Sequence, residues 1–196
     1  MAEAFKDWIG PELIRTMAKH LRRVHQAFPR ERFVKAATDG LAELELKARV
    51  VHVADALAAA LPPSFSQAAK VLEQSLAPAR SDEDLSKLVP CDAGLAGWAV
   101  WPMTDYVARY GIKQPKRALR CLRALTQRNT AEYAIRPFLI EHRELTMATL
   151  HDWLDDASPH VRRLVSEGTR PRLPWGIQLQ HLMADPTPAF TFLQQL

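Results

Sequence analysis

Two glutamates, each followed by an arginine–proline pair, lie 35 residues apart in this sequence. Glu132 precedes Arg136, and Glu167 precedes Arg170. Carboxylates that converge on one site can stabilise positive charge that develops in a transition state. A glutamate four residues before an arginine is also the spacing of an ordinary helical ion pair. The two acids are therefore candidates for catalysis, with a structural ion pair as the alternative for Glu132.

The spacing of these glutamates matches a helical repeat. An earlier copy lies at Gly97-Trp98-Ala-Val-Trp101-Pro102, where Gly97 precedes Glu132 by the same 35 residues. Periods of about 33 to 47 residues are typical of α-solenoids of the TPR, ankyrin and HEAT types, which are built from helix pairs. Since a solenoid holds equivalent positions on one face, both glutamates should line one concave groove. The repeat alone does not require acids there, because the first copy carries glycine instead.

The elements that must position these acids are helices. Alanine and leucine are abundant and only 7 of the 196 residues are glycine, which favours helix over sheet. We predict an all-α fold, an α-solenoid of helix-pair repeats that forms one domain over 1–196. Its expected parts are N-terminal helices in 1–77, a proline- and acid-rich surface loop in 78–96 and the repeat array in 97–196. Helices of the array are expected at 97–109, 115–127, 130–141, 145–155, 159–169, 175–184 and 188–196.

Composition and motifs bound the classes of function. No apolar run reaches the roughly 18 residues that span a bilayer, and the sequence begins without a secretory pattern, so no membrane partner is expected. Cys91 and Cys121 lack partners at zinc spacing, and the seven histidines are scattered. No glycine-rich phosphate loop or Gly-x-Ser-x-Gly elbow is present. These patterns predict a cytoplasmic protein that uses neither a metal nor a nucleotide cofactor.

Basic residues form two groups in a chain whose net charge is +4. Cations at steps of three and four suit the phosphate backbone of DNA, and a solvated helix face is the alternative. The first group consists of Lys113, Lys116, Arg117, Arg120, Arg123 and Arg128. The second group surrounds Glu167 and consists of Arg162, Arg163, Arg170 and Arg172. Because a carboxylate alone would repel DNA, cations around Glu167 indicate a functional surface.

Three longer blocks carry the acids and their surroundings. They are Trp98-Ala-Val-Trp101-Pro-Met-Thr-Asp105, Glu132-Tyr-Ala-Ile-Arg136-Pro-Phe-Leu139 and Glu167-Gly-Thr-Arg-Pro-Arg-Leu-Pro-Trp175. They strongly resemble the AlkC-type DNA alkylation repair proteins, which are HEAT-like-repeat DNA glycosylases distantly related to the AlkD type. The last block is more specific than any single acid–arginine pair. The resemblance extends to Ala42-Glu-Leu-Glu-Leu-Lys-Ala-Arg49 and covers nearly the whole chain.

The resemblance implies an enzyme that removes positively charged N-alkylated bases, such as 3-methyladenine and 3-methylcytosine, from double-stranded DNA and leaves an abasic site. A base alkylated on its ring departs without further protonation. What remains is to stabilise an oxocarbenium-like sugar and to position water, and carboxylates can do both. Glu132 and Glu167 would then face the deoxyribose. Trp175 would pack near the sugar or the damaged base, and Arg136 and Arg170 would orient the acids or grip phosphates.

Structural alternatives exist for several of these residues. Trp175 follows a proline at an expected helix start and could be a core anchor. Trp98 and Trp101 are three apart on one expected helix, which favours packing over DNA contact. Asp105 could be a third acid in the groove, but a solvated helix face is the better interpretation.

At the carboxy-terminal end, this sequence differs from the family that it resembles. Members of the family usually continue with further HEAT-like repeats beyond the stretch equivalent to 185–188, whereas this sequence is expected to stop within the first helix of the next repeat. The alternative function is therefore a non-catalytic HEAT-like scaffold that binds DNA or a protein partner. The glycosylase interpretation implies association with the bacterial nucleoid, and leaves open whether the base is flipped and what the oligomeric state is.

Overall fold

The computed structural model describes residues 5–80 and 84–196 of the chain. Within them the backbone forms eleven α-helices and four short 3-10 helices, and two isolated bridges are its only β-type pairings. The α-helices are α1 (Pro11–Val24), α2 (Arg30–Thr38), α3 (Leu46–Ala60), α4 (Phe65–Gln74), α5 (Val100–Tyr110), α6 (Pro115–Thr126), α7 (Arg136–Glu141), α8 (Arg143–Asp152), α9 (Pro159–Gly168), α10 (Gln180–Ala184) and α11 (Thr187–Leu193). The 3-10 helices are η1 (Phe5–Trp8), η2 (Leu41–Glu43), η3 (Leu85–Lys87) and η4 (Gly97–Ala99). None of the described helices is long and apolar enough to cross a bilayer.

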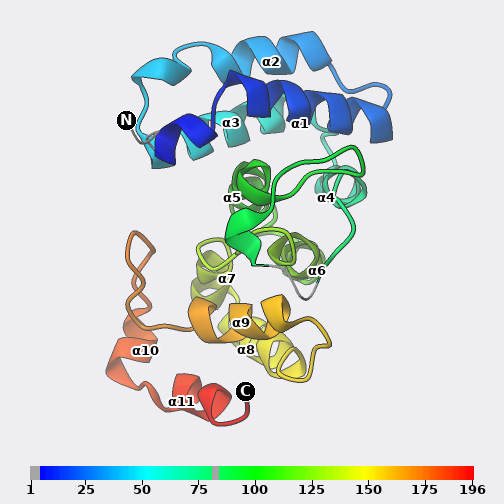
Figure 1. Ribbon diagram of the computed structural model, residues 1–196. Coiled ribbons are helices and arrows are strands. Elements are labelled where there is room, and N and C mark those ends of the chain that lie inside the picture. Colours follow the sequence, from blue (N-terminus) through cyan, green and yellow to red (C-terminus); the bar gives the residue numbers. More distant parts are fainter. Residues whose placement is uncertain (1–4, 81–83) are drawn as a thin grey trace.

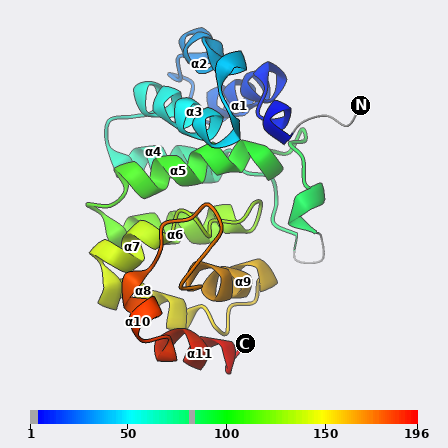
Figure 2. The same ribbon diagram turned by 90° about the vertical axis from the view of Figure 1, so that its left-hand side faces the viewer.

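The helices stack in layers, and the chain runs from one end of the stack to the other (Figure 1 and Figure 2). At the amino-terminal end, α1 packs on α2 and α2 on α3, and α3 packs on α5. Helices α4 and α5 both contact α6, which in turn contacts α8 and α9. Helix α9 contacts α11 at the other end. Each element thus contacts mainly its neighbours in the stack, and the predicted all-α solenoid of helical repeats is confirmed.

Helix α1 illustrates why these segments become helices. It begins at Pro11, where the missing N–H leaves no helical hydrogen bond unmade. Ile14, Met17 and Leu21 follow at steps of three and four, and all three side chains are fully buried. Equivalent faces of the other helices join this one in a hydrophobic core that continues through the stack.

Most helices expected in the repeat array are present, with ends displaced by a few residues. The expected ranges 97–109, 115–127, 145–155, 159–169 and 188–196 correspond to η4 with α5, α6, α8, α9 and α11. Two expected helices differ more, and both changes concern the candidate acids and their surroundings.

Helix α7 begins later than predicted. A helix is expected over 130–141, but residues 132–135 form a turn and the helix begins at Arg136. Pro137 explains the late start, because a proline is tolerated in the first turn of a helix and breaks the hydrogen-bond ladder further in. Glu132 therefore lies on the turn that precedes α7.

The segment between α9 and α10 is a loop, which we call the strap and define as residues 169–179. A helix is expected over 175–184, but only Gln180–Ala184 is helical. Prolines interrupt the helical pattern in this segment, and Trp175 has a φ of 64°, in the left-handed region that a right-handed helix excludes. In Figure 1 the strap rises from α10 towards the layers that hold α5 and α3.

The surface loop predicted over 78–96 lies partly outside the described residues, at 81–83. Its described parts are tied to the helices. The backbone N–H of Ala77 donates to the Leu95 carbonyl at 3.0 Å, and Arg23 of α1 donates to two carbonyls of the loop. These bonds bring the end of the loop against η4, where the repeat array begins.

Candidate active site

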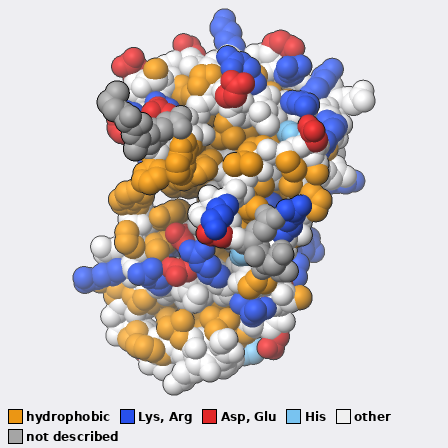
Figure 3. All heavy atoms as spheres, in the orientation of Figure 1, with side chains coloured by type: hydrophobic (Ala, Val, Ile, Leu, Met, Phe, Trp, Pro, Cys, Tyr) orange, Lys and Arg blue, Asp and Glu red, His pale blue; other side chains and the backbone are white. Residues whose placement is uncertain are grey.

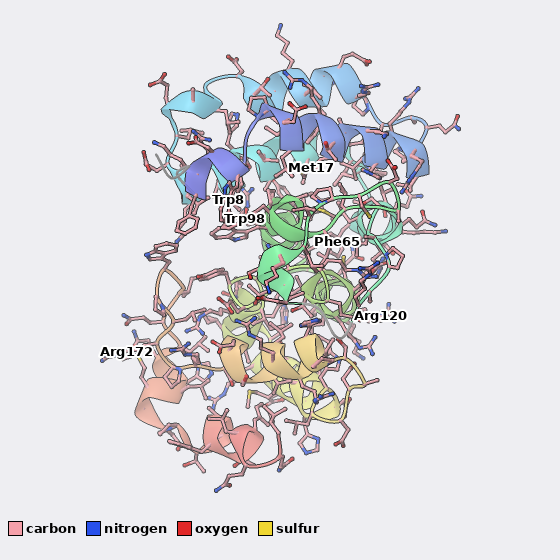
Figure 4. All side chains as sticks on the ribbon, viewed as in Figure 1. Trp8, Met17, Phe65, Trp98, Arg120 and Arg172 are labelled. Carbon is pink, nitrogen blue, oxygen red and sulfur yellow. The ribbon has the colours of Figure 1, made fainter. Side chains whose placement is uncertain are left out.

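A cavity of about 620 Å³ is bordered by η1, η4, α5, the turn before α7 and the strap. Its aromatic lining consists of Phe5, Trp8, Trp98, Trp101, Tyr133 and Trp175. Charged groups in the wall come from Glu132, Asp84 and Arg163. Figure 3 shows hydrophobic side chains gathered around a hollow, and Figure 4 shows Trp8 and Trp98 next to each other. Cavities with apolar walls and few polar groups are the usual form of a site for a small organic group.

Five of these rings form a continuous row, which we call the aromatic ladder. It consists of Phe5, Trp8, Trp98, Trp101 and Tyr133. Ring centroids are 4.9 Å apart for Phe5 and Trp8, and 5.0 Å apart for Trp8 and Trp98. The next two steps, from Trp98 to Trp101 and from Trp101 to Tyr133, are both 5.7 Å. The ladder thus reaches from η1 to the residue that follows the first candidate acid. Aromatic faces attract cations and stack on bases, so this wall suits a positively charged base.

Glu132 is half-buried on the turn before α7, and a threonine orients it. Thr130 Oγ1 donates to Glu132 Oε2 at 3.0 Å. The same hydroxyl oxygen accepts a hydrogen bond from the Glu132 backbone N–H at 3.3 Å. The carboxylate is thus held by a neutral hydroxyl and directed to the cavity that it lines.

Glu167 lies in the last turn of α9, next to the beginning of the strap. Its Oε2 accepts a hydrogen bond from Arg170 Nη1 at 2.9 Å. The pKa of the Tyr133 phenol is raised, first by burial and then by the negative charges of Glu132 and Glu167. The pKa of Arg170 is raised by its hydrogen bond to Glu167 and, more weakly, by Glu132. Glu132 and Glu167 thus both contribute to the raised pKa of Tyr133 and of Arg170, while only Glu132 is among the residues that line the cavity.

Trp175 stands at the tip of the strap with its side chain largely in solvent. It is 66% exposed, so it is not the core anchor that the sequence allowed. It lines both the large cavity and a neighbouring one of about 290 Å³. Its left-handed backbone costs on the order of 1–3 kcal/mol, which surrounding contacts must offset. One such contact is a hydrogen bond of 2.7 Å from Lys47 Nζ to the Trp175 carbonyl oxygen.

Arg136 has a different role from the one predicted. Its side chain is fully buried, and burial lowers its pKa. Its guanidinium donates to four carbonyls, those of Gly168, Arg170, Pro171 and Ile177. The expectations that it grips a phosphate, orients an acid or forms a helical ion pair with the preceding glutamate are therefore wrong. It fixes the base of the strap instead.

Several predicted DNA-binding cations are engaged within the molecule. Arg117 forms a bidentate pair with Glu73, at 2.6 and 2.8 Å, and its side chain is mostly buried. Arg128 donates to the carbonyls of Ala77 and Ala124, and burial lowers its pKa. The remaining engaged groups are Arg123, paired with Asp156, and Arg162, which donates to the Asp156 and Ala157 carbonyls. The predicted continuous row of free cations on α6 is therefore wrong.

The cations that remain exposed lie on two different sides of the molecule. Besides Arg123, which pairs with Asp156, the exposed members of the two predicted groups are Lys113, Lys116, Arg120, Arg163, Arg170 and Arg172. Arg163 lines the large cavity, and Arg170 contacts Glu167. Figure 4 places Arg172 on one edge of the molecule and Arg120 on the opposite edge. Arg120 and Arg172, one from each group, are therefore well separated on the surface.

The sequence reasoning missed most of the aromatic wall. Trp98 and Trp101 do pack on each other, as expected, but they also line the cavity. A hint was present, because Trp98 precedes Tyr133 by the same 35 residues that separate the glutamates. Trp8 had no comparable pattern, since only the packing of η1 against η4 brings it to the site.

Asp105 is half-buried in the wall of the smaller cavity, and is not on a solvated helix face. Arg109 Nε lies 2.8 Å from Asp105 Oδ2, and the same guanidinium donates to Asp55 at 2.7 Å. Burial raises the pKa of the Asp105 carboxyl, an effect that Arg109 partly offsets. The residue belongs to an ion-pair network in the wall of the smaller cavity, which Tyr133 and Trp175 also line.

Comparison with known proteins finds similar chains among curated proteins and among solved structures. No family model matches the sequence. The uncharacterized protein YhaZ of Bacillus subtilis is 34% identical over 192 residues, which cover 97% of this chain and 49% of that protein. The structure of Pseudomonas fluorescens alkylpurine DNA glycosylase AlkC, bound to DNA containing an abasic site analog, superposes with a TM-score of 0.85 at 33% identity, over 100% of this chain and 51% of that one. The chain thus spans about half the length of each.

Proposed function

We propose that this chain, which is an AlkC-type relative, is a DNA repair glycosylase that hydrolyses the N-glycosidic bond of cationic N-alkylated bases. One observation carries the proposal. Glu132 lines a 620 Å³ cavity with an aromatic wall, and Glu167, which comes from the next repeat, contributes with Glu132 to the raised pKa of Tyr133 in that wall. The likeness to a glycosylase bound to DNA supports a role in DNA alkylation repair.

The chemistry needs little beyond negative charge and a water molecule. In a base alkylated on its ring, the C1′–N bond breaks with its electron pair on the departing base, which becomes neutral. Positive charge then develops on the deoxyribose, where two carboxylates can stabilise it. Water adds to C1′ and loses a proton, for which Glu132 or Glu167 would be the acceptor. The product is an abasic site and a free base.

The aromatic wall favours a cationic base over a neutral one. Trp98, Trp101 and Tyr133 present π-surfaces in the cavity that Glu132 also lines. A cation near aromatic faces gains about 0.5–2 kcal/mol, depending on how far it is desolvated. Trp175 at the cavity mouth would contact the sugar or the damaged base. We place 3-methyladenine and 3-methylcytosine in this class of substrate.

The duplex is best placed on the face that carries the strap. Arg163, Arg170 and Arg172 lie around Glu167 in this part of the chain and can neutralise phosphates next to the two acids. Arg120 lies on the opposite edge, away from Arg172. We therefore assign the phosphate contacts at the site to the arginines around Glu167.

Base release from methylated duplex DNA tests the proposal. We expect Glu132→Gln and Glu167→Gln each to lower the single-turnover release of 3-methyladenine or 3-methylcytosine by about 10²–10³-fold, because each removes negative charge from the developing cation. DNA affinity should be unchanged or slightly higher. Glu144→Gln is the control, because Glu144 is an exposed glutamate on α8 that does not line the cavity.

Two results would count against the enzyme. If the wild-type chain releases no more base than Glu132→Gln, the proposed activity fails. If DNA still binds tightly in that case, the chain is a non-catalytic HEAT-like scaffold.

A further inference from the structure

The strap is fixed at its base by a single buried side chain. Arg136 donates to the carbonyls of Gly168, Arg170, Pro171 and Ile177, so it joins the beginning of the strap to its end. The backbone N–H of Leu179 donates to the Pro171 carbonyl at 3.1 Å and closes the same loop. The base of the strap is therefore rigid. These bonds do not reach its tip, at Trp175.

The tip is held by a contact from another layer of the stack. Trp175 is mostly exposed and has a left-handed backbone, so its own packing cannot fix it. The turn around it is closed by the Gly176 N–H, which donates to the Leu173 carbonyl at 3.0 Å. Lys47 of α3 then donates from Nζ to the Trp175 carbonyl at 2.7 Å, across 128 residues of sequence. An ammonium donor makes this hydrogen bond stronger than one between neutral groups.

The same turn of α3 also holds the opposite border of the cavity. Lys6 of η1 lies 2.8 Å from Glu45, directly before α3. Arg49 is buried, and its Nη1 donates to the Lys6 carbonyl at 2.8 Å. Phe5 and Trp8, which lie on η1, are thereby fixed to α3. The start of α3 therefore sets the distance between η1 and the tip of the strap, the two borders of the cavity.

We propose that Lys47 is a positioning residue, which holds Trp175 over the cavity so that the ring meets the sugar or base beside Glu132. The inference rests on the proposed glycosylase function. Lys47 acts through the backbone of Trp175 and need not touch the substrate. Loss of Lys47 should therefore slow the chemical step, in which the Trp175 ring must be in place, and should leave the affinity for DNA unchanged. An ammonium group that instead bound a phosphate would show the reverse pattern.

The first experiment compares Lys47→Met and Lys47→Arg with the wild type. Lys47→Met keeps the aliphatic stem and removes the donor, so we expect single-turnover base release at saturating protein to fall about tenfold, which is 1.4 kcal/mol of activation free energy. The Kd for the same DNA should stay within about twofold. Lys47→Arg keeps a donor and should restore most of the rate. Lys70→Met, on an exposed lysine of α4 that lines neither cavity, controls for loss of one positive charge.

A second experiment follows the strap without reference to activity. Trypsin can cut after Arg172, whereas Arg170 is protected by the proline that follows it. We expect the Arg172–Leu173 bond to be cut several times faster in Lys47→Met than in the wild type or Lys70→Met. The midpoint of thermal unfolding should not change, because Lys47 is exposed and its hydrogen bond holds only the tip of the strap.

The outcomes separate this inference from the proposed function. Equal cleavage after Arg172 in Lys47→Met and wild type would overturn it, and so would a freed strap with unchanged base release. A loss of DNA affinity with an unchanged chemical step would make Lys47 a phosphate contact and also overturn it. A wild type that releases no base would defeat the proposed function, while the cleavage comparison would still decide whether Lys47 holds the strap.

Discussion

At the scale of single residues, two arginines with the same sequence setting have opposite surroundings. Arg136 and Arg170 each follow a candidate acid and precede a proline. Arg136 is fully buried among backbone carbonyls, whereas Arg170 is exposed and bonded to Glu167. The difference comes from the strap, which folds back over Arg136 and has no counterpart over Arg170. Motif spacing located both residues but could not assign their roles.

The buried arginine should be critical for stability. We expect Arg136→Met to lower the free energy of unfolding by about 3–5 kcal/mol, because four carbonyls lose their donors in a buried place. Arg136→Lys should recover little, since one ammonium cannot reach all four. Urea denaturation measures both. Arg120→Met, on an exposed arginine, should stay within about 0.5 kcal/mol. A loss below about 1 kcal/mol for Arg136→Met would contradict this account.

The site was partly predictable at this scale. Glu132, Glu167 and Trp175 could be found because they sit in repeat-related or family-like blocks. Trp8 could not, because its place depends on how η1 packs on η4, which no local pattern encodes. The hydroxyl of Thr130 that orients Glu132 was also unpredictable, since it depends on the turn that replaces the expected start of α7.

At the scale of elements, Gly97 explains why the first repeat copy carries no acid. It has a φ of 61°, and its N–H donates to the Arg128 carbonyl at 2.9 Å. A Cβ atom at this position would lie 2.0 Å from the Leu88 carbonyl oxygen. Any side chain at this position, glutamate included, would collide with the Leu88 carbonyl and push that part of the loop away from η4. The first copy therefore uses its position to fix a loop, and the later copies use it to present acids.

This close approach makes a matched pair of glycine substitutions informative. Gly97→Ala should lower the free energy of unfolding by about 3 kcal/mol or more, since it adds a clash to left-handed strain. Gly40→Ala is the control, because Gly40 has a φ of 66° but no atom within 4 Å of the place that a Cβ would occupy. It should cost only about 1–2 kcal/mol. Equal losses in chemical denaturation would show that the contact with Leu88 does not matter.

The helices could be predicted from the sequence where a proline and the spacing of apolar residues indicate the same helix start. The start of α1 at Pro11 and that of α6 at Pro115 are examples. The prediction of a helix over 130–141 was wrong for its first half, because α7 begins at Arg136 with Pro137 in its first turn. The helix expected over 175–184 is absent from the strap for a less local reason, since the Ile177 carbonyl accepts a hydrogen bond from the Arg136 side chain instead of from a backbone N–H.

At the scale of the whole molecule, the exposed cations divide into two surfaces. Arg172 and Arg120 lie on opposite edges, and Arg163, which is close to Glu167 in the sequence, lines the aromatic cavity. Each arginine that neutralises a phosphate contributes about 0.9 to the slope of log K against log salt concentration. Salt dependence can therefore locate the DNA on the molecule.

We expect Arg172→Gln to reduce that slope by about 1, because Arg172 lies in the strap on the face assigned to the duplex. Arg120→Gln should leave the slope unchanged, although both changes remove one positive charge. Fluorescence titrations of labelled duplex DNA at several salt concentrations would measure the two slopes. A reduced slope for Arg120→Gln alone would place the duplex on the α6 edge, away from the two acids.

The hold of Arg136 on the strap has a consequence for how such a protein can diversify. Its four acceptors are backbone carbonyls, which every amino acid supplies. The exposed side chains between Arg172 and Gln178, such as Trp175 and Ile177, are therefore not needed to anchor the segment that carries them, whereas Leu173 is buried. New residues could be exchanged there, by natural drift or by engineering, without rebuilding the scaffold beneath. Exposed residues of the strap can therefore be exchanged to change substrate preference while the fold stays the same.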